Sequence, residues 1–482
     1  MKILLIKPPL NPNLIAPSKG EPLELEYLAS AAKEHDVEIL DMRIDKNLMK
    51  KLDKLKPNLV GVTAYTCDVN AALEVFREVK KYDSRIKTII GGYHATAMPS
   101  DFALPFVDVI FQGMADFSFK QYLQTWEAGG DFESVKNIAL VKGNDLLFTE
   151  QEPFQANLDS LPFPLRHLTR HYRKYYRDQM RNKMAMILSS RGCPFRCTFC
   201  ACWKMMYGKY LVRNPESVVE EMSTLPEDVS LVFFADDNTL HSIGRAWRLS
   251  ELIKKRKINK RFTMYARADT IVKHPDLIES LRDAGLESLT VGVESSRDEQ
   301  LDKFKKKTSV QINNEAIRIL QKLRIGNIAH FIVNPNFTKD DFRYLLEYVL
   351  DRRLFQPVFT VLTPLPGTEL YQEYYDQLLI KNYDFYDHVH SVLPAALSRK
   401  EFYEQVARLY RKSYSFARYF KSRFNDLRRA FKKSKDILPR DVDRLSFIKL
   451  VFLHILGYSL YLKYINIYKT EPLILKKEKT GF

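Results

Sequence analysis

The sequence predicts an α/β protein with two parallel sheets and a helical C-terminal region. Short apolar runs alternate with helical patterns over residues 1–150, as in a doubly wound, Rossmann-like parallel sheet. A second alternating series occupies residues 184–375, and its six units are too few for a closed eight-unit barrel. We therefore expect a partial (β/α)6 barrel there. Residues 151–183 indicate a linker, and residues 376–482 a helical, basic C-terminal region.

The first series supplies strand ends at which a ligand could bind. Proline, glycine or polar residues bound its apolar runs, as turn residues bound strands. The expected strands are 3–7, 37–41, 59–65, 86–92 and 107–113, with helices at 23–33 and about 71–81. Ligands of open parallel sheets lie at the carboxyl ends of the strands. The residues at or just after these ends are Thr63, Thr66, Gly91, Gly92, His94 and Gly113.

The second series follows a basic stretch. Its expected strands are 184–190, 231–237, 261–267, 286–295, 328–334 and 357–363. Helical spacing lies between them, for example at 217–222, 245–255, 275–284 and 314–323. Consecutive βα units of this kind form a parallel sheet whose strands follow one another in order.

The composition excludes several classes of protein. Hydrophobic residues make up 45% of the 482 residues, which is too many for a largely disordered chain. The formal net charge of +16 favours an anionic partner such as a membrane surface, nucleic acid or acidic substrate. No secretory signal is apparent at the N-terminus. We therefore expect a cytoplasmic protein that can associate peripherally with a membrane.

Four of the five cysteines lie between Cys193 and Cys202. Cys193, Cys197 and Cys200 stand at i, i+4 and i+7 on a loop after an expected strand, where thiolates suit zinc or iron–sulfur clusters. A structural zinc site needs four ligands, and Cys202 is too close to Cys200 to complete one easily. Three thiolates on a four-iron cluster leave one iron open. A zinc knuckle remains the alternative.

This spacing, with an aromatic residue before the last cysteine, resembles the radical S-adenosylmethionine (SAM) superfamily. The resemblance implies that Cys193, Cys197 and Cys200 ligate a [4Fe–4S] cluster whose fourth iron binds SAM. One electron then cleaves SAM to a 5′-deoxyadenosyl radical. Phe199 would lie near the adenine. Cys202 lies outside the motif, and we interpret it as a small buried residue.

Downstream segments resemble further SAM-binding motifs of the superfamily. Those at 233–238, 265–269, 292–296 and 364–368 follow the family order, and Lys-Lys-Lys-Thr at 305–308 replaces the usual Asn-Lys-Gly. The resemblance places Asp237, with Asp236 as its close alternative, near the SAM amino group. It places Arg267 near the carboxylate. The implied contacts to the ribose or methionine part are Glu294 and Ser295.

The first domain resembles the cobalamin-binding domain that precedes many radical SAM cores. The resemblance rests on residues 91–96, 107–113 and the linker segment 157–164. The strand-end residues given above would then contact cobalamin. No Asp-x-His-x-x-Gly string supplies an axial histidine, which this subfamily commonly lacks. A second departure is Gly-Met-Ala-Asp at 113–116, where Gly-Glu-x-Glu is usual.

The combined resemblance implies a cobalamin-dependent radical SAM methyltransferase acting on an unactivated carbon of a small or lipid-like substrate. Segments 330–335, 360–368 and 387–394 are similar to hopanoid-type methylases. The alternative is an oxidative cyclase or rearrangement enzyme, such as the ring-forming cyclases of chlorophyll synthesis. A tRNA-modifying enzyme is disfavoured because Cys67 is the only cysteine outside the cluster region. The implied partner is an electron donor such as flavodoxin or ferredoxin, and nucleic acid is not expected.

The C-terminal region is strongly basic and partly apolar. Residues 408–435 hold eleven Lys and Arg residues against Asp426 alone. Residues 450–462 lack any Lys or Arg, and thirteen residues are too few to span a bilayer. Such a helix suits a membrane interface, or it caps the barrel. Asp387, His388 and His390 could face the substrate or form an ordinary surface pair.

Overall fold

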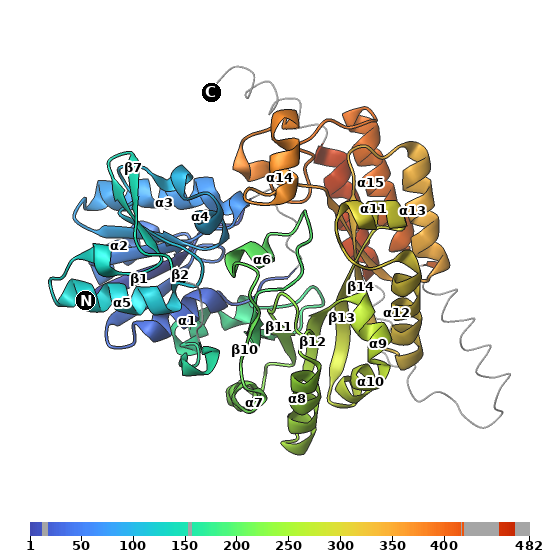
Figure 1. The fold of residues 1–482 in the computed structure, drawn as a ribbon, viewed down its shortest axis with the longest axis horizontal. Helices are drawn as coiled ribbons and strands as arrows, with labels where there is room; N and C mark the ends of the chain where they lie inside the picture. The colour runs from blue at the N-terminus through green and yellow to red at the C-terminus, as the bar shows by residue number, and fades with distance from the viewer. Residues whose placement is uncertain (12–17, 153–156, 416, 419–452, 468–482) are drawn as a thin grey trace.

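The computed structural model of this chain describes residues 1–11, 18–152, 157–415, 417–418 and 453–467 (Figure 1). Its first sheet has the strand order β2-β1-β3-β4-β5-β6-β7, of which the first five are parallel and the last two antiparallel. The strands are β1 (Lys2–Lys7), β2 (Asp36–Asp41), β3 (Leu59–Thr63), β4 (Lys87–Gly91), β5 (Val109–Phe111), β6 (Ile138–Lys142) and β7 (Asp145–Phe148). The order 2-1-3-4-5 is that of a doubly wound fold.

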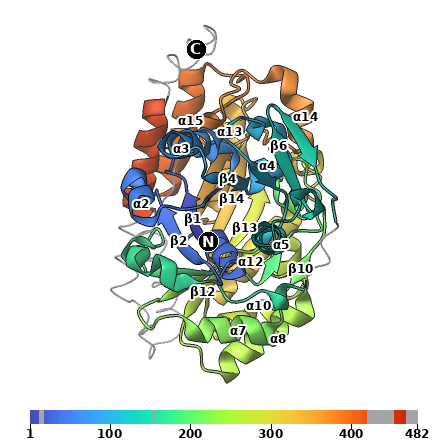
Figure 2. The ribbon, with the colours of Figure 1, turned by 90° about the vertical axis from the view of Figure 1, so that its left-hand side faces the viewer.

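Helices cover both faces of this sheet because its strands are apolar on both faces. In β1, Ile3 and Leu5 pack into one cluster, while Leu4 and Ile6 pack into another. The first cluster lies under α1 (Leu23–Ala31) and α5 (Ala115–Glu127), and the second under α2 (Leu48–Leu55) and α3 (Val69–Tyr82). Figure 2 shows α2 and α5 on opposite sides of these strands. The predicted doubly wound sheet is thus confirmed.

The second sheet has six parallel strands in the order β8-β11-β12-β13-β14-β15. They are β8 (Met184–Ile187), β11 (Leu231–Phe234), β12 (Arg261–Ala266), β13 (Leu286–Glu294), β14 (Gly326–Val333) and β15 (Gln356–Val361). The helices between them are α7 (Pro215–Thr224), α8 (Ile243–Lys255), α9 (Ala268–Lys273), α10 (Pro275–Asp283), α11 (Asp298–Lys303), α12 (Val310–Leu323) and α13 (Lys339–Asp351). Because β8 and β15 are not neighbours, the barrel is open, as the sequence predicts.

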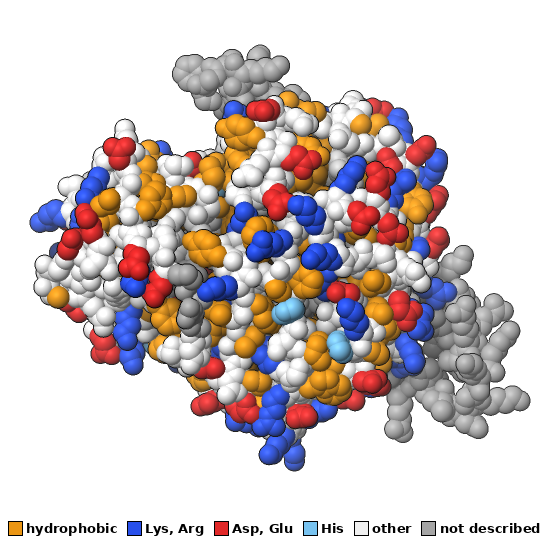
Figure 3. Space-filling view, viewed as in Figure 1, with side chains coloured by type: hydrophobic (Ala, Val, Ile, Leu, Met, Phe, Trp, Pro, Cys, Tyr) orange, Lys and Arg blue, Asp and Glu red, His pale blue; other side chains and the backbone are white. Residues whose placement is uncertain are grey.

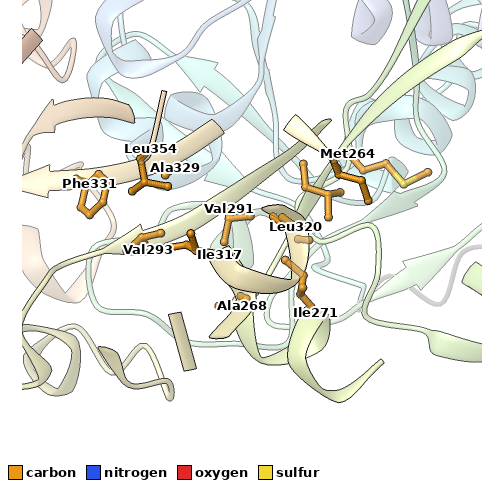
Figure 4. Packing of buried hydrophobic residues seen from close by; sticks show 14 of the residues in the cluster. Met264, Ala268, Ile271, Val291, Val293, Ile317, Leu320, Ala329, Phe331 and Leu354 are labelled. Carbon is orange, nitrogen blue, oxygen red and sulfur yellow. The ribbon is translucent and has the colours of Figure 1, made fainter. Parts of the chain in front are cut away.

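The outward face of the barrel strands forms the largest hydrophobic cluster. Val291 and Val293 of β13 and Phe331 of β14 are almost fully buried, together with Ile317 and Leu320 of α12 (Figure 4). Helix α12 has apolar residues at helical spacing, so one face of it packs on the sheet.

The inward face of the same strands is not filled. Tyr265 of β12 is 37% exposed, whereas Met264 beside it is fully buried. Gly292 of β13, His330 of β14 and Thr360 of β15 are partly accessible, and all three point to the inward face. Closed βα barrels pack this interior with side chains. The inward face of these strands is therefore more accessible than their outward face.

Tyrosine hydroxyls cover the free edge of β15. The Tyr410 hydroxyl donates to the carbonyl of Phe359 at 2.9 Å and accepts from its N–H at 3.0 Å. The Tyr414 hydroxyl donates to the carbonyl of Pro357 at 2.9 Å. These residues belong to α15 (Arg399–Ser413) and the residue after it, and helix 453–467 packs beside them through Leu460 and Tyr464. An open sheet edge needs such cover because its unpaired backbone groups would otherwise recruit another strand.

A buried charge network joins the linker to both sheets. Arg166, at the start of the 3-10 segment η5 (Arg166–Tyr175), forms ion pairs with Glu21 and with Glu221 of α7. Its guanidinium also donates to the carbonyl of Met186 in β8, at 2.6 Å. Glu26 of α1 lies 3.7 Å from the same guanidinium. The network fixes the first domain against β8 and α7 of the barrel.

Several elements of the fold were not predicted from the sequence. The hairpin of β6 and β7 was not predicted, although Gly143-Asn144 between two apolar runs is a turn signal. Helices α2, α5 and α13 were not predicted either. Residues 416 and 419–435 of the basic stretch 408–435, and residues 450–452 of the apolar stretch 450–462, lie outside the described residues.

Candidate active site

The three cysteines lie on the loop of residues 192–210, which we call the cysteine loop and which a small sheet closes. Strands β9 (Ser190–Arg191) and β10 (Leu211–Val212) pair antiparallel at its two ends. Gly192 has a φ of +82°, and a Cβ there would meet the carbonyl oxygen of Lys209 at 2.2 Å, so only glycine fits where the strands cross. Cys197 is buried, while Cys193 and Cys200 are half-buried.

Cys202 begins the short helix α6 (Cys202–Met205) and is half-buried rather than buried. Its thiol hydrogen-bonds to Cys200, and this bond lowers the pKa of the Cys200 thiol. The same contact raises the pKa of the Cys202 thiol, and so does the charge of Asp237. Of these two thiols, Cys202 therefore holds its proton more tightly than Cys200 does.

The two adjacent aspartates after β11 face different ways. Asp236 accepts hydrogen bonds from the backbone N–H groups of Ser189 and Ser190, at 2.6 and 3.0 Å. It is buried and holds the turn that leads into the cysteine loop. Asp237 accepts from the N–H of Gly192 at 2.8 Å and lines a cavity. Burial raises the pKa of both carboxyls.

The Arg267 side chain contacts two loops. Its guanidinium lies 3.7 Å from the ring centroid of Phe195 in the cysteine loop. It donates to the carbonyls of Lys306 and Lys307, at 2.7 and 3.2 Å, and its Nε donates to Asp269. In this structure Arg267 therefore joins the cysteine loop to the loop after α11.

Glu294 sits at an irregularity of β13 with a φ of +61°, a conformation that costs a non-glycine residue energy. Its carboxylate accepts from the Lys306 ammonium at 2.6 Å in a buried ion pair. Ser295 is buried next to it, and its hydroxyl accepts from the N–H of Arg297 at 3.0 Å, just before α11.

Lys306 is a site residue that sequence reasoning missed. Burial disfavours its charge, but Glu294 and Cys197 outweigh this and raise the pKa of the ammonium. The ammonium also lies 5.9 Å from the ring centroid of Phe199, which packs edge-on against Phe304. A signal for it was present in the sequence, because Lys306 stands at the lysine position of the usual Asn-Lys-Gly motif.

The segment 305–308, which departs from the usual motif, has two residues in the left-handed backbone region. Lys305 and Lys307 stand where Asn and Gly are usual, and both have left-handed φ values of +50° and +53°. Asn and Gly adopt this region more readily than lysine does. The loop therefore has the conformation that the motif residues favour.

A cavity of about 320 Å³ separates the cysteine loop from the strand ends of the first sheet. The first sheet contributes Thr63, Gly91, Gly92 and Gly113, and the barrel side contributes Gly192 and Asp237. A Cβ on Gly91 would have Phe111 as its nearest neighbour, at 3.7 Å, so this position is open. Gly92 is different: its φ is +103°, and a Cβ would lie 2.9 Å from the carbonyl oxygen of Ala64.

The structure does not bring Thr66 and His94 into this cavity. The buried His94 ring contacts the Thr66 hydroxyl through Nδ1 at 3.2 Å and the Asp101 carboxylate through Nε2 at 3.0 Å. Tyr383 from the C-terminal region packs against the ring at 4.6 Å. Both ring nitrogens thus have protein partners, and His94 joins the first domain to the C-terminal region.

The Gly-Met-Ala-Asp departure is explained by its neighbours. Asp116 forms a two-bond ion pair with Arg191 at the start of the cysteine loop. Met114 packs into a small apolar cluster with Leu158 and Met206. Asp116 therefore keeps the acidic character of the second glutamate position and bridges the domains. Met114 replaces the first glutamate with an apolar side chain.

The last loop of the barrel also touches the first domain. The Tyr93 hydroxyl, on α4 (Tyr93–Ala97), donates to the carbonyl of Pro366 at 2.6 Å. The N–H of Leu370 donates to the carbonyl of Thr198 in the cysteine loop at 3.0 Å. Of the histidine group, Asp387 and His390 form a buried pair at 2.8 Å, and His388 is exposed.

Comparisons with known proteins agree with this architecture. The profile of the radical SAM superfamily matches residues 187–349, and that of the B12 binding domain matches residues 15–121. Hopanoid C-3 methylase of Methylococcus capsulatus is 26% identical over 411 residues, covering 82% of this chain and 78% of the relative. Anaerobic magnesium-protoporphyrin IX monomethyl ester cyclase of Cereibacter sphaeroides is 29% identical, covering 82% and 67%.

Among solved structures, the cobalamin-dependent S-adenosylmethionine radical enzyme OxsB matches with a TM-score of 0.70 at 16% identity, covering 98% of this chain and 75% of that one. The two domains and their junction define an enzyme of the radical SAM superfamily with an N-terminal B12-binding domain. The chain thus carries the domain pair of the cobalamin-dependent radical SAM enzymes, and its cofactors are a [4Fe–4S] cluster, SAM and cobalamin.

The residues present fit these cofactors. Three thiols on one loop are soft donors, and no carboxylate stands between Cys193 and Cys200 in the sequence. Among the described residues, no three His, Cys, Asp or Glu side chains already form a metal cage. The glycine-lined strand ends leave backbone open to a large flat ligand.

Proposed function

We propose that this enzyme transfers a methyl group to an unactivated carbon of a small or lipid-like substrate. The supporting observation is the cavity between the strand ends of the B12-binding domain and the cysteine loop. When bound, the cluster and SAM supply a carbon-centred radical by one-electron reduction, and cobalamin supplies the methyl group. We also propose that the domains are 1–150, 184–375 and 376–482, with 151–183 as the linker.

The chain's own residues would hold and shield these groups. We assign Cys193, Cys197 and Cys200 to the cluster, and Asp237 to the amino end of SAM, since it is the aspartate that lines the cavity. Asp236 and Arg267 act as positioning residues, because their polar atoms hold the turns on both sides of the cysteine loop. The contacts of Tyr93 and Leu370 close the junction and exclude water, which would quench a radical.

Glu294, Ser295 and Phe199 stand on the barrel side of this junction. The Glu294 carboxylate accepts a hydrogen bond from the buried ammonium of Lys306, and its remaining acceptor capacity suits it to hold hydroxyl groups of a ribose. Phe199 is suited to lie against an adenine face. Thr63, Gly91, Gly92 and Gly113 would form the cobalamin side of the cavity, and Thr66 and His94 would support its wall.

The partly accessible inward face of the barrel supports an apolar substrate that carries few polar groups. Its inward positions include Phe233, Tyr265, Ile328 and Val358, with hydroxyl groups at Thr263 and Thr360. Helix 453–467 presents Ile455, Tyr458 and Leu462 at 56%, 53% and 41% exposure along one face. Such a stripe suits the surface of a membrane, where a lipid-like substrate resides. No helix among the described residues is long and apolar enough to cross one.

A ring-forming cyclase is the second candidate, because the cyclase relative is 29% identical to this chain. An isotope label on the methyl group of SAM distinguishes the two reactions. With SAM carrying a 13C-methyl group, a methyltransferase incorporates the label into product detected by mass spectrometry. Substrate turnover without incorporation, but with loss of hydrogen from the product, would instead assign the cyclase.

A further inference from the structure

The outer surface of the cysteine loop carries cations stacked on an aromatic ring. The Arg196 guanidinium lies 5.6 Å from the ring centroid of Trp203, and the Lys204 ammonium lies 4.3 Å from the same centroid. Cation–π contacts of this kind hold long side chains in place. We call Arg196, Trp203 and Lys204 the basic patch. It is directly adjacent in sequence to two cysteines, since Arg196 precedes Cys197 and Trp203 follows Cys202.

The charges of the basic patch are not neutralised within the described part of the chain. No carboxylate there lies within 4.0 Å of Arg196 or Lys204, whereas the nearby Lys303 and Lys305 pair with Glu299 and Glu369. Figure 3 shows Lys and Arg side chains gathered at the middle of the face where Figure 1 places α6. Cations that have no carboxylate partner attract an acidic protein through long-range electrostatics.

The cysteine loop has two sides with different surroundings. Gly192 and Met206 line the cavity on its inner side, while Pro194, Arg196 and Tyr207 are exposed on its outer side. Electron transfer slows steeply with distance, so a protein that reduces a cluster on this loop must approach its exposed side. The outer side is the one that carries the basic patch.

We propose that the basic patch is the docking site of an acidic one-electron donor protein that carries a flavin or an iron–sulfur centre. The proposal rests on the proposed function, because only cluster chemistry requires such a donor. Each reductive event passes one electron from the reduced donor to the cluster, and the donor leaves oxidised by one electron. Charge complementarity at such a site governs the association rate and its salt dependence more than it governs the chemistry.

The test reverses the charges of the patch. Arg196→Glu/Lys204→Glu is compared with Lys50→Glu/Lys54→Glu, which makes the same charge change on exposed residues of α2 in the other domain. Binding of oxidised flavodoxin is measured by calorimetry at low and high salt. We expect the patch variant to bind about tenfold more weakly at low salt and to lose most of its salt dependence, while the α2 variant binds like wild type.

A second measurement compares two reductants. SAM cleavage driven by reduced flavodoxin should fall in the patch variant, and cleavage driven by dithionite should stay near the wild-type rate. Equal weakening of binding by both variants would overturn the proposal, because net charge alone would explain it. An equal fall with dithionite would also overturn it, because the loop itself would be disturbed. Absence of SAM cleavage in wild type would instead count against the proposed function and leave the binding result standing.

Discussion

The buried ion pair between Glu294 and Lys306 exists because residue 292 has no side chain. A Cβ on Gly292 would lie 2.2 Å from the Glu294 carboxylate and 2.7 Å from the Lys306 ammonium. The pair joins the end of β13 to the loop after α11, and the same loop is held by Arg267. The charge pair next to the cysteine loop thus requires a glycine inside strand β13.

We predict that Lys306→Met destabilises the protein by about 3 kcal/mol, because it leaves the Glu294 carboxylate buried without its cation. Glu294→Gln/Lys306→Met should recover much of this loss, since neither partner is then charged. Urea unfolding of the apo-protein measures both free energies. A double variant that is less stable than Lys306→Met would contradict the pairing.

Lys307→Gly should stabilise the protein by about 1 kcal/mol, because glycine adopts a φ of +53° without the cost that lysine bears. Glu347→Gly, at an exposed position inside α13, is the control and should destabilise by about 1 kcal/mol. Thermal unfolding compares the two. If both variants lose stability, the left-handed conformation at position 307 is not strained.

Stability should fall as pH rises towards 8 because of one buried carboxyl. Burial and the neighbouring Glu21 raise the pKa of Glu26 to about 8, from its usual 4.5. The folded state therefore binds this proton more tightly than the unfolded chain does. Its stabilising contribution is complete below the unfolded pKa and is lost as pH rises through the folded pKa.

Glu26→Gln should accordingly flatten the decline in unfolding free energy between about pH 5 and about pH 9. The matched control is Glu34→Gln, whose side chain is 83% exposed. Chemical denaturation across this range gives both slopes. The assignment to Glu26 fails if the two variants keep the same pH slope as wild type.

Two adjacent glycines should respond differently to substitution. Gly91→Leu places its side chain in open space and should block cobalamin retention while leaving the melting temperature close to wild type. Gly92→Ala should lower the melting temperature, because its φ of +103° and the Ala64 carbonyl exclude a Cβ. Gel filtration with excess cobalamin and thermal melts separate the effects. Full cobalamin retention by Gly91→Leu would show that the cavity is not the cobalamin site.

The sequence was most informative where motif residues act through the backbone. The apolar periodicity predicted the two sheets. It also placed the glycines at strand ends and the three cysteines on a loop after a strand. It could not separate Asp236 from Asp237, because adjacent residues point to opposite sides and only the fold decides which side holds the cavity. His94 was placed with the cavity because it follows a strand end, but its ring nitrogens turn to Thr66 and Asp101. Lys306 was missed because its neighbours differ from the motif.

The central claim is that Cys193, Cys197 and Cys200 hold the cluster that cleaves SAM, and iron content with reductive SAM cleavage tests it most directly. After anaerobic reconstitution, wild type and Cys202→Ala should each hold about four irons per chain and cleave SAM with dithionite. Ala variants at Cys193, Cys197 or Cys200 should cleave none, because each removes one of three anchors. If Cys202→Ala loses its iron while Cys193→Ala keeps iron and cleaves SAM, the ligand assignment is wrong.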